Sequence, residues 1–173
     1  KVNDNKGGGI FTDGATTVAD MPAMFAAGIQ YSPFDKLLVS ASMNLFMDKN
    51  VDYDGSESLE INMIDKNFKE YAVGLEYGLT EKLRASAGWV GTYTGVNANY
   101  QNDLRYSLNT NSIGGGFGFR LNNMLDLNLG AMYTIYEEGS KSFNHMLGAN
   151  AIPVLETYNK STWIMAIGLD FSF

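Results

Sequence analysis

The stretch "TWIMAIGLDFSF" (residues 162–173) alternates strictly between two kinds of residue. One set of alternate positions is large and apolar: Trp163, Met165, Ile167, Leu169, Phe171 and Phe173. The positions between them include Gly168, Asp170 and Ser172. Successive side chains of a strand point to opposite faces, so this pattern predicts a strand with one apolar face. The run exceeds the about 5–6 residues of an ordinary soluble strand and suits the about 9–11 that cross a membrane.

The same alternation recurs in six earlier runs, while helical periodicity is hardly seen. The apolar side of the runs carries no charge, as expected where a lipid-facing charge at mid-membrane costs about 2–4 kcal/mol. The pattern predicts an all-β chain that contributes about seven strands to a transmembrane antiparallel β-barrel. The six runs span residues 23–32, 37–47, 69–79, 83–94, 111–121 and 124–136.

The connections between the runs alternate in length. Short turns are "SPFDK" (32–36), "LTEK" (79–82) and "LNNM" (121–124), whereas long polar loops fall at 48–68, 95–110 and 137–161. This alternation is typical of bacterial outer-membrane barrels, which have tight periplasmic turns and long external loops. We therefore expect the outer membrane of a Gram-negative bacterium, with the C-terminus in the periplasm.

Aromatic residues gather at both ends of the expected strands. Such belts mark the two membrane–water interfaces. A soluble sandwich or small barrel explains the alternation equally well, but it does not explain the strand lengths, the loop pattern or the belts. The lower belt contains Tyr31, Tyr77, Phe119, Phe171 and Phe173, and the upper belt contains Tyr71, Tyr93, Tyr133 and Trp163.

Composition excludes several classes of protein. The net charge of -7 argues against nucleic-acid binding, which requires a basic face. The chain has no cysteine, so it forms neither a disulfide framework nor a cysteine metal site. No run of about 18 apolar residues predicts a transmembrane helix. The opening "KVND" is not a signal peptide, so we expect a removed signal or a longer parent chain.

The opposite side of the runs is small or polar, with many glycines. Its charges lie near the lower strand ends, and opposite signs there can pair. We expect a lumen-facing network that ties the wall to material inside the barrel; a second role, for Arg84 or Arg120, is to guide a substrate carboxylate. The network is predicted to contain Glu76, Arg84, Arg120, Asp126 and Asp170.

Other motifs give weak signals. "DYDGSESLE" (52–60) departs from a calcium loop and predicts an acidic external loop. The "GGG" at 7–9 and at 114–116 lacks the context of a phosphate-binding loop. His145 is the only histidine and has no nearby acid or cysteine in the sequence. We therefore expect no enzyme activity, no metal and no cofactor.

Four stretches resemble the FadL/TodX family of outer-membrane transporters of long-chain fatty acids and aromatic hydrocarbons. They are "MPAMFAAGIQYSPFDKLLVSASMNLF" (21–46), "NFKEYAVGLEYGLTEKLRASAGWV" (67–90), "SIGGGFGFRLNNMLDLNLGAMYTIYEEGS" (112–140) and the final "TWIMAIGLDFSF". The family has a fourteen-stranded barrel with an N-terminal plug inside. The resemblance implies that residues 1–173 are the C-terminal portion of one barrel domain, without the plug and first strands.

The resemblance also implies function and partners. It implies passive uptake of hydrophobic small molecules through a barrel embedded in membrane lipid. The terminal strand ending in Phe173 resembles the signal that the outer-membrane assembly machinery reads.

Three other interpretations stay open. The chain fits a structural or protein-binding barrel that uses its long loops for secretion or surface interactions. It also fits a complete eight-stranded barrel with its first strand within residues 1–20. An outer-membrane esterase or protease requires His145 close to Ser and Asp partners.

Overall fold

The computed structural model describes residues 20–49, 51, 63–102 and 104–172. Within these residues the chain is all-β, and its helical structure includes one short 3-10 turn, η2 (Ala98–Tyr100). No helix in this part of the chain is long and apolar enough to cross a membrane.

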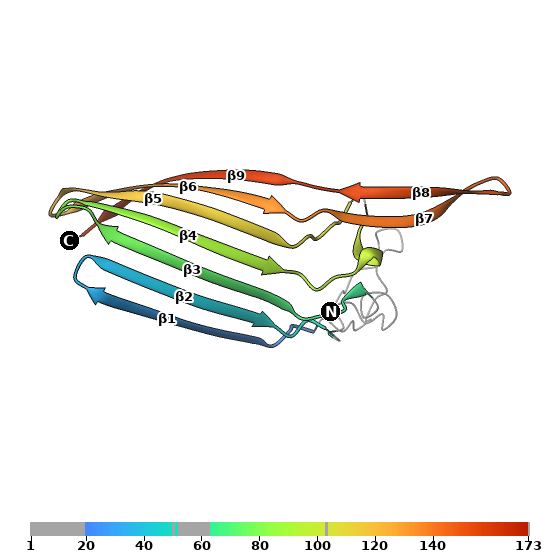
Figure 1. The fold of residues 1–173 in the computed structure, drawn as a ribbon, viewed down its shortest axis with the longest axis horizontal. Coiled ribbons are helices and arrows are strands. Elements are labelled where there is room, and N and C mark those ends of the chain that lie inside the picture. The colour runs from blue at the N-terminus through green and yellow to red at the C-terminus, as the bar shows by residue number, and fades with distance from the viewer. Residues whose placement is uncertain (1–19, 50, 52–62, 103, 173) are drawn as a thin grey trace, which may run out of the picture.

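Seven strands form one antiparallel sheet, in the order β1-β2-β3-β4-β5-β6-β9 (Figure 1). Six antiparallel steps separate β1 from β9, so these two edge strands run in the same direction. The strands are β1 (Met24–Phe34), β2 (Leu37–Phe46), β3 (Phe68–Gly78), β4 (Leu83–Tyr93), β5 (Thr110–Asn122), β6 (Leu125–Tyr136) and β9 (Ser161–Phe171).

The seven predicted runs are confirmed as strands, with bounds that differ by at most two residues. The three short turns are confirmed too, and all three lie at one end of the sheet, here called the turn end (Figure 1). The opposite end, where the long connections lie, is called the cap end. Turn chemistry is visible locally: the Thr80 hydroxyl accepts from the backbone N–H of Lys82 and Leu83, and Asn122 accepts from that of Met124.

The predicted polar loop at 137–161 is wrong in one respect, because most of it is a β-hairpin. β7 (Gly139–Leu147) pairs with β8 (Asn150–Tyr158) around a two-residue turn, in which Gly148 has φ 65°. This hairpin continues from β6 and leads into β9, and it projects beyond the sheet at the cap end (Figure 1). The sequence "GSKSFNHML" does not alternate and Pro153 lies in β8, so period-2 analysis missed the strands.

A small packed cap covers the base of the hairpin. It comprises residues 63–67, 94–102 and 104–109, and its buried residues include Ile64, Gln101 and Leu108. Tyr106 stacks on Tyr158 of β8 with ring centroids 5.4 Å apart. The cap therefore fixes where the hairpin leaves the sheet.

The register gives the sheet two distinct faces. The register is irregular at two places, between Tyr31 and Phe34 and between Arg120 and Asn122. Elsewhere in the seven strands, odd-numbered residues lie on one face of the sheet and even-numbered residues on the other. The odd-numbered face, here called the apolar face, is exposed: Ile167 is 77% and Trp163 68% accessible. The even-numbered face lines a hollow and is here called the concave face.

Candidate functional site

The concave face encloses an open hollow of about 860 Å³ that extends from β2 to β9. Its middle is nearly bare of side chains, because small residues meet in register across the strands. Gly74 pairs with Gly88 and Gly88 with Gly114, while Gly116 pairs with Gly130. Over β3, β4 and β5 the central zone of the hollow is therefore bounded by backbone atoms and small side chains, and the same row continues onto Met132 and Ile164.

Close approach between strands explains part of this glycine content. A Cβ on Gly116 would lie 2.5 Å from the carbonyl oxygen of Leu129, and one on Gly114 would lie 3.0 Å from that of Ala131. Side chains at these points would force β5 and β6 apart. The glycines thus both shape the wall and leave the hollow open.

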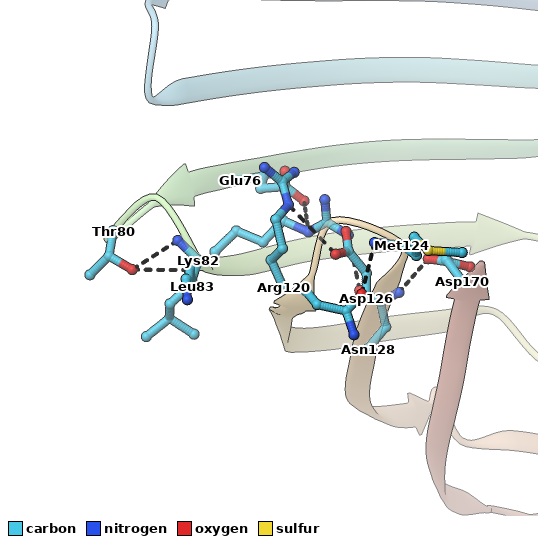
Figure 2. A network of polar contacts seen from close by, with 11 residues as sticks. Glu76, Thr80, Lys82, Leu83, Arg120, Met124, Asp126, Asn128 and Asp170 are labelled. Carbon is cyan, nitrogen blue, oxygen red and sulfur yellow. Dashed lines mark hydrogen bonds and ion pairs between the residues drawn. The ribbon is translucent and has the colours of Figure 1, made fainter. Parts of the chain in front are cut away.

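Polar side chains gather on the concave face at the turn end (Figure 2). Arg84 of β4 lies at the centre of this network. Its Nε is 3.9 Å from Glu76 Oε2, its Nη2 is 3.9 Å from Asp126 Oδ2, and Nη2 also donates to Asn128 Oδ1 at 3.1 Å. Arg84 therefore links β3, β4 and β6 across the face.

Two more links complete the network. Arg120 Nε lies 3.6 Å from Asp126 Oδ1, and Asn128 Nδ2 donates to Asp170 Oδ2 of β9 at 2.6 Å. The structure thus brings together all five charged residues expected there. The sequence placed Asn128 on this face without assigning it to the network. Its bridging role depends on the β5–β6–β9 register, which sequence alone does not supply.

The ion pairs are long and partly solvated. The exposed fractions of the side chains are 38% for Arg84, 42% for Glu76, 24% for Asp126 and 56% for Arg120. Exposed pairs of this kind contribute about 0–1 kcal/mol each. The network therefore positions charges more than it holds the sheet together.

Gly118 makes the central contact possible. It lies between Arg84 and Asn128 in the β4–β5–β6 ladder. A Cβ at this position would collide with Arg84 Nε and would lie 2.8 Å from Arg84 Cγ. The arginine side chain therefore crosses β5 directly over the Gly118 backbone.

A second polar group lies toward the cap end of the concave face. Asn44 donates to Glu70 Oε1 at 3.0 Å, and the Thr92 hydroxyl lies 3.5 Å from Glu70 Oε2. Ser112 and Thr134, both buried, share a hydrogen bond of 2.8 Å. The bare glycine zone thus lies between two polar zones.

The expected aromatic residues lie at the strand ends on the apolar face. Toward the cap end, the rings of Tyr71 and Tyr93 pack edge to face with their centroids 6.2 Å apart. The ring centroids of Tyr133 and Trp163 are 4.4 Å apart. Toward the turn end lie Tyr31, Tyr77, Phe119 and Phe171, and Phe173 falls outside the described residues.

The expectation of a charge-free apolar face needs one correction. β3 begins at Phe68, so Lys69 lies on this face at its cap end, opposite Tyr93. The run predicted at 69–79 already begins with this lysine, but its outward-facing positions were counted only from Tyr71. A terminal lysine can extend its ammonium group past the apolar surface into water.

The weaker motifs form no site of their own among the described residues, although Gly114 and Gly116 line the hollow. His145 lies on β7 opposite Ile152, and residues 114–116 lie inside β5. The stretches 7–9 and 52–60 fall outside the described residues. Within the described part of the chain, no three His, Asp or Glu side chains are placed to hold a metal ion.

No family model matches the chain, and no curated protein matches it.

Proposed function

We propose that this chain forms part of the wall of an outer-membrane β-barrel that admits hydrophobic small molecules, as its resemblance to the FadL/TodX family suggests. The observation that carries the proposal is the difference between the two faces of one single-layered sheet. One face is apolar, exposed and nearly uncharged, and the other lines a hollow with glycine and polar side chains.

Lipid is the environment that suits the apolar face. No described element covers it, and residues such as Val73, Ile113 and Met165 are more than half exposed. Soluble monomers rarely expose apolar patches larger than a few hundred Å². A soluble sandwich requires a second layer on this face, which is absent among the described residues.

The strand directions indicate how such a wall closes. β1 and β9 run in the same direction, so an all-antiparallel ring requires an odd number of further strands between them. Seven further strands satisfy this condition and give the fourteen that the resemblance implies. Closure also pairs both edges, as hydrocarbon surroundings demand.

The hollow suits passage better than chemistry. Among the described residues its central zone offers no nucleophile–base pair, only backbone, glycine, small side chains and the apolar side chains of Met132 and Ile164. We therefore assign it a passive role toward long-chain fatty acids or aromatic hydrocarbons, with the five-residue network lying near its turn end.

Uptake by the full-length protein tests this function. A strain lacking its own hydrophobic transporters is supplied with the gene, and accumulation of a labelled fatty acid and an aromatic hydrocarbon is measured. Fractionation shows whether the protein reaches the outer membrane. Uptake above the empty-vector strain supports the proposal, whereas correct insertion without uptake of either compound refutes the transport role alone.

The β7–β8 hairpin favours a second candidate, a barrel that binds another protein at its outer end. Met146, Leu147 and Leu155 on this hairpin are 60%, 64% and 66% exposed. Replacing residues 141–156 with a short Gly-Ser linker distinguishes the two functions. Transport should survive this change, whereas a surface-binding role should not.

A further inference from the structure

Three neighbouring hollows share one lining residue. The large hollow of about 860 Å³ occupies the middle of the sheet, and hollows of about 310 and 50 Å³ lie beside the turns. Arg84 lines all three, and no other described residue does so. Arg84 therefore lies where the central hollow borders the spaces at the turn end.

Gly118 and Asn128 set the conformation of the Arg84 side chain. The side chain crosses β5 over Gly118, where a Cβ would collide with it. Beyond Gly118 its Nη2 reaches Asn128 at 3.1 Å. Arg84 thus extends over the wall as a bar, and Gly118 provides the space in which it lies.

The bar has carboxylates on both sides. Glu76 on β3 and Asp126 on β6 each lie 3.9 Å from the Arg84 guanidinium, through different nitrogen atoms. The Arg84 side chain, 38% of which is exposed, therefore borders the hollow with a carboxylate on each side of it.

We propose that Arg84 is a specificity-determining residue that limits, by its position, the width of solutes passing between the central hollow and the turn end. This inference rests on the proposed function, because it assumes that solutes travel along the concave face. Gly118 acts as a positioning residue that sets the height of the Arg84 side chain above the wall.

Single-channel conductance of the full-length protein in planar bilayers tests the inference without relying on uptake. Arg84→Ala removes the bar, and Arg84→Met removes its charged end while keeping most of its stem. Gly118→Ala keeps the charge but displaces the side chain. Lys82→Ala is the matched control, because it removes a cation at the same end and Lys82 lines only the smallest hollow. Heat-modifiable gel mobility verifies folding of each variant.

We expect conductance to rise in Arg84→Ala, to rise less in Arg84→Met, to change in Gly118→Ala and to stay unchanged in Lys82→Ala. Conductance of both Arg84 variants equal to that of the parent protein overturns the inference. An equal rise in Lys82→Ala also overturns it, because charge alone then explains the effect. If conductance rises in the Arg84 variants but the parent protein takes up no hydrophobic compound, the inference about Arg84 is supported and the transport role is refuted.

Discussion

Lys69 lies directly opposite Tyr93 in the β3–β4 ladder, at the cap end of the apolar face. It is the one charged residue on this face of the seven described sheet strands. A lysine at an interface can keep its ammonium group in water, whereas one at mid-membrane cannot do so without cost. The position of Lys69 at the end of its strand is therefore compatible with an apolar face that contacts lipid.

A lysine placed at the centre of the apolar face should destabilise the protein. Val73 lies in the middle of β3, opposite Ala41 and Trp89, and is 51% exposed. In a membrane, Val73→Lys should reduce the free energy of unfolding by about 2–4 kcal/mol. The measurement is denaturant unfolding of the full-length protein from lipid vesicles.

Ala72→Lys provides the control, since Ala72 is the adjacent residue on the concave face. It should cost much less than Val73→Lys. Equal costs for the two variants would mean that the apolar face does not contact lipid.

The Trp89 indole requires the absence of a side chain at Gly91. A Cβ on Gly91 would lie 2.5 and 2.6 Å from Cζ2 and Cη2 of the ring. Trp89 Nε1 also donates to Asn111 Oδ1 at 3.2 Å. Gly91→Ala should displace the indole and reduce the free energy of unfolding by about 1–3 kcal/mol, the usual effect of overpacking.

A double-mutant cycle with Trp89→Phe verifies the cause of this loss. Phenylalanine lacks the two clashing atoms, so Gly91→Ala should cost less in the Trp89→Phe background. A cost that is the same in both backgrounds would trace the effect to the backbone of β4 instead.

The sequence predicted the seven sheet strands because a two-faced strand must alternate, and alternation is a local property. Lys69 was missed although it is the first residue of the predicted run 69–79, because the apolar face of that run was counted from Tyr71. The β7–β8 hairpin was missed because its strands, away from the two-faced sheet, need not alternate. The charged residues of the network could be predicted from the side of the strand on which they lie and from their position near the strand ends. The roles of Gly118 and Asn128 could not, because they depend on a register that joins residues far apart in sequence.

Ser112 and Thr134 form a buried hydroxyl pair on β5 and β6, with 2.8 Å between the oxygens. Ser112→Ala leaves the Thr134 hydroxyl buried without this partner and should cost about 1–3 kcal/mol in the free energy of unfolding. Adding Thr134→Val removes the second hydroxyl while keeping its shape. The double variant should therefore be more stable than the sum of the single effects predicts, and strict additivity would show that the hydroxyls do not depend on each other.

The cap depends on Gln101, which is 5% exposed. Its Nε2 donates to the Ser107 carbonyl at 2.7 Å, and its Oε1 accepts from the Ser107 N–H at 2.9 Å. Gln101→Ala leaves both backbone groups without this partner. It should lower the free energy of local unfolding of the cap by about 1–3 kcal/mol and leave the stability of the sheet unchanged. Hydrogen exchange at the Ser107 amide should therefore accelerate while amides in β3 and β5 keep their protection.

Gln30→Ala on exposed β1 is the matched control for that experiment, because it removes the same side chain from a position without a comparable backbone contact among the described residues. It should leave the exchange at Ser107 unchanged. Unaltered exchange in Gln101→Ala would mean that the cap is held by Ile64, Leu108 and the Tyr106–Tyr158 stack, and that the glutamine only fills space between them.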